Sequence, residues 1–248
     1  MSAFYNGFIF NPLYNLLISL FTVLPWIDAG IAVIILTVIV RLILFPLSKK
    51  AVLTQVKMQG INTELKFIKD KYKDKEEQAR KTLELYKEKG VNPFSGILVL
   101  LIQLPIIFAL YKIFLHAGFP NVDIKLLYPF IHAPEHISTF FLGIVDITKK
   151  SIPLALLAAA STYFQLKLAT VNQSKPKNKS EVKNSFGEDL AQSMQTQMKY
   201  FFPVLVFFIS YNISGVIALY WLVSNLFTIG QEIVVRKGIL KEQLTANS

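Results

Sequence analysis

The stretch LTVIVRLILFPLS, residues 36–48, places one arginine, Arg41, among uncharged and mostly aliphatic side chains. The apolar run around it covers about 29–47, close to the roughly 20 residues that a helix needs to cross a bilayer. Arg41 lies roughly 10 Å along a helix from Ser48, where the span ends. Its charge therefore either extends to the nearby interface or belongs to a functional site, because a charge facing lipid is costly. Position alone leaves both interpretations open.

The composition indicates a membrane protein. Of 248 residues, 53% are hydrophobic, including 20 Phe and 10 Tyr, which is too apolar for one soluble core. The formal net charge is +10, so the charged residues must be concentrated outside the bilayer. The chain contains no cysteine, which excludes disulfides, thiolate metal sites and cysteine nucleophiles. We expect one domain, residues 1–248.

Hydrophobic runs predict an all-α polytopic fold with five transmembrane helices. The fourth span is short, because the break at 212–215 divides an apolar run that is too long for one straight helix. The expected spans are about 29–47, 94–115, 152–170, 200–212 and 213–234.

The distribution of basic residues predicts the orientation. Twelve Lys and Arg lie in 49–89 and none in 1–40. By the positive-inside rule, the N-terminus and residues 116–151 lie outside, and the C-terminus lies in the cytoplasm. The cytoplasmic segments are then 51–89, 171–198 and the short tail 235–248.

Residues 8–26 are expected to form an amphipathic helix in the outer interface. Asn11, Asn15, Ser19 and Thr22 recur at helical spacing and form one polar stripe. A sixth span or a signal sequence are the alternatives for this segment, although it lacks a basic flank and a clear cleavage site.

The charged segment 51–89 predicts two amphipathic helices that form an antiparallel cytoplasmic hairpin, with a break at Lys73–Lys75. Seven acidic residues alternate with the basic ones in 49–89, which argues against specific nucleic-acid binding because phosphates favour unopposed cations. The segment 171–198 is polar and is expected to be a flexible loop.

Polar residues inside the spans recur on single helix faces. Thr37 lies one turn before Arg41, and in the last span polar residues follow every three or four positions. Interhelical hydrogen bonds explain one or two such residues, and they explain a continuous line less well. We expect a hydrated groove, open to the cytoplasm, lined by Arg41, Thr37, Gln103, Gln165, Trp221, Ser224 and Asn225.

The sequence shows no catalytic motif, so we do not expect an enzyme. It lacks HExxH, GxSxG and a phosphate-binding GxxxxGK[ST] loop. His116, His132 and His136 have no neighbouring carboxylate cluster, and surface histidines are the simpler interpretation. No metal and no cofactor is expected.

Three stretches together resemble the YidC/Oxa/Alb family of membrane protein insertases, in its short five-span bacterial form. They are ILTVIVRLILFPLSKK (35–50), LYKEKGVNPFSGILVLLIQLPIIFALY (85–111) and QTQMKYFFPVLVFFISYNISGVIALYWLVSNLFTIGQE (195–232). The similarity covers roughly residues 12–236. We expect this chain to lack the large external domain and the lipoprotein-type N-terminus of other branches, the latter because it contains no cysteine.

The resemblance implies a bacterial plasma-membrane protein that inserts and helps to fold nascent membrane proteins without nucleotide hydrolysis. It implies a groove in the inner leaflet centred on Arg41, with Thr37, Gln165 and Trp221 in the groove or in contact with the client. It further implies ribosome–nascent chain complexes and the Sec translocon as partners. Tail-driven ribosome docking is not expected, because 233–248 contains three basic residues.

Two rival functions stay open. A small anion transporter would use Arg41 as its substrate site, but the sequence shows no internal repeat. A scaffold would assemble membrane proteins without inserting them.

Overall fold

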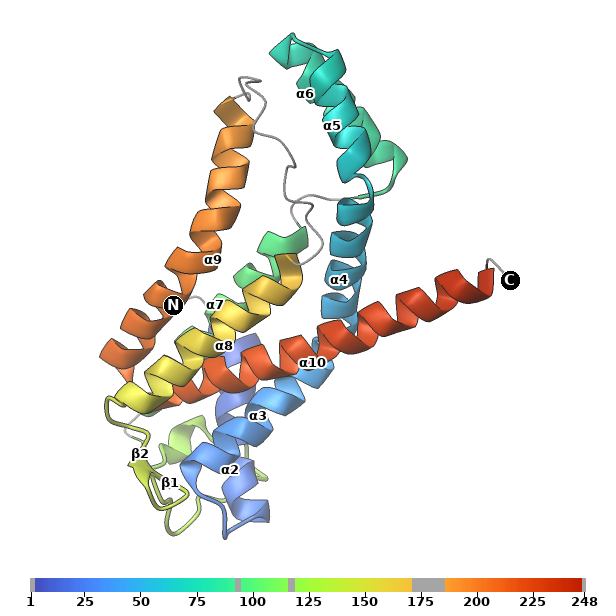
Figure 1. Ribbon diagram of the computed structural model, residues 1–248. Helices are drawn as coiled ribbons and strands as arrows, with labels where there is room; N and C mark the ends of the chain where they lie inside the picture. Colours follow the sequence, from blue (N-terminus) through green and yellow to red (C-terminus); the bar gives the residue numbers. More distant parts are fainter. Residues whose placement is uncertain (1–2, 92–94, 116–118, 171–185, 247–248) are drawn as a thin grey trace.

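The computed structural model describes residues 3–91, 95–115, 119–170 and 186–246. These residues are mainly helical (Figure 1). The N-terminal elements are α1 (Ala3–Tyr5), the π-helical turn η1 (Asn6–Phe10), α2 (Asn11–Val23), α3 (Ala29–Ile43), α4 (Phe45–Gly60), α5 (Asn62–Lys71) and α6 (Lys75–Glu88). They are followed by α7 (Ser95–Leu115), the 3₁₀ turn η2 (Ile124–Leu126), β1 (Phe140–Phe141), β2 (Val145–Asp146), α8 (Ile152–Thr170), α9 (Phe186–Ile213) and α10 (Gly215–Ala246).

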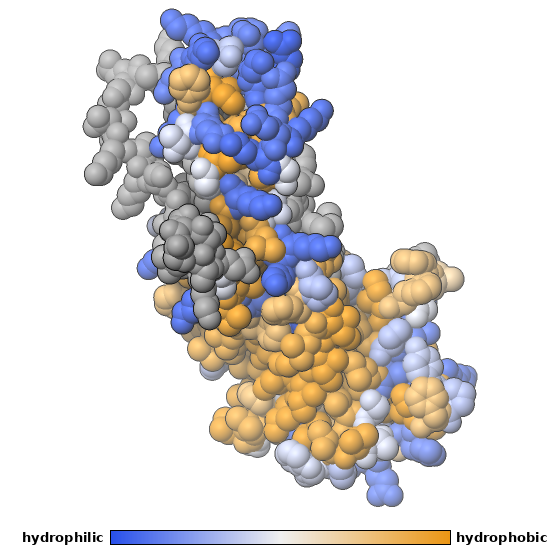
Figure 2. Space-filling model, turned by 90° about the vertical axis from the view of Figure 1, so that its right-hand side faces the viewer, coloured by the Kyte–Doolittle hydropathy of each residue, from blue (hydrophilic) through white to orange (hydrophobic). Residues whose placement is uncertain are grey.

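The main core is formed mainly by buried residues of α2, α3, α7 and α10. Helix α10 also packs closely on α8. Ala155, Ala158 and Ala218 are fully buried there, and small side chains allow helix backbones to approach closely. Figure 2 shows hydrophobic residues over the middle and lower part of the molecule, whereas hydrophilic residues gather at the upper end, which carries α5 and α6 in Figure 1. This segregation is typical of a membrane protein.

Helix length alone establishes fewer spans than the five predicted. In the described part of the chain, Gly215–Ile239 is long and apolar enough to cross a membrane, and α3 with Phe45–Met58 forms a second span if the bent pair is counted as one. Shorter apolar helices lie at Gln103–Leu115, Ile152–Leu168 and Lys199–Ile213. The five-span count stays a prediction.

The first predicted span is not one straight helix to residue 47. α3 ends at Ile43, and α4 starts at Phe45 with a bend of 62°. Pro46 explains the break, because it has no N–H for a helical bond and its ring clashes with the carbonyl four residues earlier in a continuous helix.

The charged segment also differs from the expected two helices. Helix α4 continues from the first predicted span into the charged segment and ends at Gly60. A second break, at Ile61, precedes α5. Glycine is a weak helix former, which favours the break at this point. The structure therefore has three helices, α4 to α6, where the sequence predicts the end of a span and two helices.

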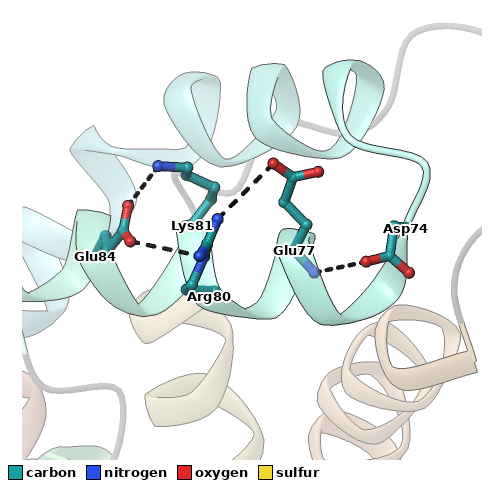
Figure 3. Close-up of polar contacts among 5 residues, drawn as sticks. All are labelled: Asp74, Glu77, Arg80, Lys81 and Glu84. Carbon is teal, nitrogen blue, oxygen red and sulfur yellow. Dashed lines mark hydrogen bonds and ion pairs between the residues drawn. The ribbon is translucent and has the colours of Figure 1, made fainter.

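The helices α5 and α6 lie antiparallel. The start of α5 meets the end of α6, because Lys89 Nζ pairs with Glu64 Oε1 at 3.0 Å and the buried Ile61, Leu85 and Val91 form a small core. Asp74 caps α6 by accepting a 3.1 Å hydrogen bond from the Glu77 N–H (Figure 3).

Two further boundaries are corrected. The expected flexible loop 171–198 is helical from Phe186, where α9 begins, since Glu, Leu, Ala, Gln and Met in this stretch are good helix formers. Residues 171–185 lie outside the described residues. The tail 235–248 continues α10 as helix to Ala246.

The N-terminal helix runs beside α7. Tyr5 donates a hydrogen bond to the carbonyl of Pro105 at 3.2 Å, and Lys112 Nζ lies 4.8 Å from the centre of the Phe10 ring. Asn15 is 1% exposed. The buried part of the polar stripe at Asn15 binds Leu126 and Tyr128, and the interfacial placement of residues 8–26 stays a prediction.

Both the nitrogen and the oxygen of the Asn15 side-chain amide bind backbone groups of the segment 119–132. Its Nδ2 donates to the carbonyl of Leu126 at 2.9 Å, and its Oδ1 accepts from the Tyr128 N–H at 2.7 Å. The Thr22 hydroxyl donates to the carbonyl of His132 at 3.0 Å. The described part of the predicted outer loop, residues 119–151, is thus folded over the ends of the helices. We call this segment the cap.

The cap contains a small antiparallel β-hairpin, so the fold is not purely α. Phe140 pairs with Asp146, and Phe141 with Val145. The Phe141 ring packs on Gly30 of α3, where a Cβ atom would lie 2.6 Å from the ring Cγ. The cap also binds the start of α10, since Gly215 N–H donates to the Lys149 carbonyl at 2.7 Å.

Candidate functional site

Arg41 lies in the last turn of α3, at the place where α3, α7 and α10 meet. Its side chain is 7% exposed. The Nε atom donates to Ser224 Oγ at 2.8 Å, and Nη2 donates to Gln103 Oε1 at 2.8 Å and also to Ser224 Oγ. The structure therefore brings together three of the predicted site residues, and Arg41 does not extend freely to the interface.

Ser224 is the centre of this cluster. Its fully buried hydroxyl also accepts from Gln103 Nε2 at 3.3 Å. Tyr220, one turn earlier on α10, is 2% exposed and interacts with Ser224 through its hydroxyl. Sequence reasoning did not select Tyr220, although its i, i+4 spacing to Ser224 was a usable signal.

The cluster is positively charged. The bonding partners of Arg41 are neutral, and among the described residues no carboxylate forms an ion pair with it. Glu232, which is buried further along α10, pairs with Arg236 at 2.8 Å. Hydrogen bonds offset part of the desolvation cost of Arg41, but its charge stays uncompensated and attracts anionic groups.

A second polar cluster joins α10 to α8. Asn225 is 6% exposed, and its Nδ2 donates to Ser161 Oγ at 3.0 Å and to Thr162 Oγ1 at 2.7 Å. Neither Ser161 nor Thr162 was selected as a site residue from the sequence. Ser224 and Asn225 therefore face different helices, and the predicted polar line on α10 divides between two contacts.

The remaining predicted residues lie near these clusters without joining their hydrogen bonds. Thr37 is 1% exposed and donates to the Val33 carbonyl of its own helix at 2.6 Å. Gln165 is half-buried, one turn after Ser161 on α8. Trp221 is buried on α10, one turn before Asn225.

The described residues contain no group of three or more His, Asp or Glu side chains that could hold a metal ion. His132 and His136 are exposed, and His116 lies outside the described residues. The chemistry of the two clusters is hydrogen bonding and electrostatic attraction.

Residues 19–243 match the family model described as 60Kd inner membrane protein. The chain belongs to this family. The resemblance noted in the sequence is thereby confirmed, since its similar relatives are named Membrane protein insertase YidC. Membership of the 60Kd inner membrane protein family also confirms the prediction of a membrane protein.

Two relatives differ in how much of them the chain covers. The Pelobacter propionicus YidC is 32% identical over 215 residues, which are 84% of this chain and 35% of the relative. The Clostridium tetani YidC is 29% identical over 225 residues, which are 90% of this chain and 87% of the relative. The chain thus spans about a third of the Pelobacter relative but most of the Clostridium one.

A solved structure shares the fold. It is described as an active YidC insertase crystal structure with the first transmembrane domain resolved, and it aligns with a TM-score of 0.56 at 23% identity. The alignment covers 94% of this chain and 47% of that one.

Proposed function

We propose that this protein is an insertase and chaperone that moves newly made membrane proteins into the bacterial plasma membrane without nucleotide hydrolysis. The observation that carries the proposal is Arg41, a buried cation whose bonding partners are the neutral Ser224 and Gln103. The insertase names of the family relatives support it. No catalytic step, metal or cofactor is required.

The buried positive charge of Arg41 favours a client, that is, an inserted protein, with acidic side chains. Moving a polar segment across about 30 Å of hydrocarbon is costly, and a buried cation lowers that cost for acidic side chains. The hydrogen bonds of Arg41 use Nε and Nη2, which leaves Nη1 for water or a client carboxylate. Ser224 and Gln103 hold the guanidinium plane so that this edge stays available.

The other site residues are assigned to a hydrated groove that opens to the cytoplasm and to lipid. Thr37, Gln165 and Asn225 hold water along its walls, and Trp221 guides the apolar segment of the client toward the bilayer. The short fourth span thins the bilayer near the groove and shortens the path still to be crossed.

The cap and the distribution of charges support one orientation. The cap binds the first residues of α3 and of α10, and α8 begins directly after it, so these three helices start at one end. The helices α5 and α6, which belong to the basic segment 49–89, lie at the opposite end of the molecule from the β-hairpin (Figure 1). We place the cap and the N-terminus outside and the α5–α6 hairpin and the C-terminus in the cytoplasm.

The proposed partners are nascent membrane proteins, ribosome–nascent chain complexes, the Sec translocon and the lipid bilayer. The hairpin α5–α6, at the cytoplasmic end, is the element that first meets the client. Specific nucleic acids and small molecules are not proposed as ligands.

Reconstitution of the purified protein tests the proposal. In proteoliposomes, a client with a short acidic N-terminal tail should become protected from external protease without ATP, whereas empty liposomes should give no protection. Saturable uptake of a small anion without client insertion would instead favour the transporter. Client binding without protection would favour a scaffold.

A further inference from the structure

The hairpin tip of the cap has a composition that does not suit a water-exposed turn. Residues 140–145 read FFLGIV and contain no polar side chain. Phe141 packs inward on Gly30, but Leu142 is 61% exposed and Ile144 is 79% exposed. We call this segment the apolar tip.

The backbone conformation of the turn also differs from what a leucine in a water-exposed turn would favour. Leu142 and Gly143 have φ angles of 52° and 70°, and such hairpin turns in water favour Asn-Gly or Asp-Gly. Leucine is a costly residue at positive φ. A solvent-facing turn gains nothing from an exposed leucine in this conformation, whereas a turn in lipid gains from its apolar side chain.

The backbone donors of the apolar tip are satisfied within the protein. The Leu142 N–H donates to Asp28 Oδ2 at 2.9 Å, and the N–H groups of Gly143 and Ile144 donate to the carbonyls of Phe140 and Phe141 at 3.2 and 3.0 Å. A segment entering lipid must pair such groups, because no water is there to bind them. This pairing makes the tip compatible with an apolar medium.

The position of the tip fits the outer boundary of the bilayer. Asp28 also caps α3 through its Oδ1, and the Ala29 N–H donates to the Ser138 carbonyl at 2.8 Å, so the tip lies beside the first turn of an apolar helix. Trp26, 75% exposed, lies two residues before Asp28, and tryptophan is enriched at membrane interfaces. In Figure 1 the β-hairpin and the end of α2 lie at the same end of the molecule.

We infer that the apolar tip, together with Trp26, inserts into the outer leaflet at the boundary between headgroups and acyl chains. The tip carries no charge, so the contact is with the hydrocarbon of the lipid rather than with anionic headgroups. The tip thereby anchors the cap to the bilayer beside α3. This inference goes beyond the proposed insertase activity, and it rests on the proposed orientation only for the choice of the outer leaflet.

Spin-label accessibility tests the inference in the full chain, because the absence of cysteine permits single-cysteine variants without other changes. Ile144→Cys and Trp26→Cys carry the test labels. Phe108→Cys, 55% exposed on α7, is the lipid reference, and Glu135→Cys, on the exposed outer loop, is the water reference. Each labelled protein is reconstituted in phosphatidylcholine vesicles.

The ratio of collisions with oxygen to collisions with a nickel chelate is then measured, since oxygen concentrates in lipid. Labels at 144 and 26 should give ratios near that of 108 and several-fold above that of 135. A ratio at 144 equal to that at 135 would overturn the inference. Shielding at 144 from both reagents, relieved by dilution into more lipid, would also overturn it and would indicate a second protein copy.

Discussion

Arg41 and Ser224 are joined through Nε and Oγ at 2.8 Å, which fixes the end of α3 against the middle of α10. The Ser224 hydroxyl also accepts a hydrogen bond from Nη2 of Arg41, so one small side chain orients the guanidinium group. Gln103, on the third helix α7, accepts a further hydrogen bond from Nη2. The charge of Arg41 is therefore held in a defined direction at the junction of three helices, which is the geometric basis of the proposed function.

Asn225 should stabilise the contact between α10 and α8. Asn225→Ala removes the 2.7 Å bond to Thr162 and the 3.0 Å bond to Ser161. A double-mutant cycle of Asn225→Ala with Thr162→Val should give a coupling energy of about 0.6 kcal/mol in a thermal or denaturant assay, since interhelical bonds in membranes are modest. Strictly additive effects would show that the bond contributes nothing.

Gly30 should tolerate no side chain, because Phe141 occupies the space. Gly30→Ala should lower the free energy of unfolding by about 1–3 kcal/mol, the usual cost of overpacking. Gly230→Ala is the matched control, since a Cβ at Gly230 meets nothing within 4 Å. Phe141→Gly should make Gly30→Ala harmless, because the Cβ of Phe141 alone would already lie 2.8 Å from the new side chain. Continued destabilisation by Gly30→Ala in the Phe141→Gly background would argue against the contact.

Asn15 should hold the cap on the N-terminal helix. Asn15→Leu leaves the Tyr128 N–H and the Leu126 carbonyl without their partner, at a cost on the order of 2 kcal/mol. We expect faster proteolysis of the cap within 119–132 in reconstituted protein. The control is Asn212→Leu, because Asn212 is exposed and its amide donates within its own helix, to Phe208. Equal cleavage rates in the two variants would refute the role.

The hairpin should weaken in acid. The hydrogen bond from Lys81 lowers the pKa of Glu84 below its ordinary value, so this pair contributes stability above the ordinary pKa and loses it as the pH falls through the lowered one (Figure 3). Hydrogen exchange of α6 amides, corrected for intrinsic rates, should show more protection in the wild type than in Glu84→Gln near neutral pH. The difference should disappear once Glu84 is protonated, and it should shrink in high salt. A difference that is unchanged in acid would exclude the ion pair as its cause.

The sequence predicted the helical runs well because long apolar segments leave few alternatives in a bilayer. It predicted boundaries less well. The break at Leu44 depends on Pro46, and the early start of α9 at Phe186 depends on helix-forming residues in a polar stretch. The β-hairpin was missed because Phe141 finds its partner, Gly30, far away in the sequence.

The sequence also predicted only part of the site. Arg41, Gln103 and Ser224 were selected as polar residues inside apolar spans, and the structure brings them together. Spacing could not show that Ser224 and Asn225 serve different neighbours. Adjacent helix positions differ by about 100° around the axis, so a line built from such pairs divides between two partner helices.

Client insertion by Arg41 variants tests the central claim most directly. Purified wild type, Arg41→Ala, Arg41→Lys and the control Lys112→Ala, which removes a cation from α7 outside the cluster, are compared in liposomes with a client whose N-terminal tail is acidic. We predict that Arg41→Ala loses most of the protease-protected client, that Arg41→Lys retains a large part because charge matters more than the guanidinium shape, and that Lys112→Ala behaves as the wild type. Equal protection with Arg41→Ala and the wild type would contradict the account.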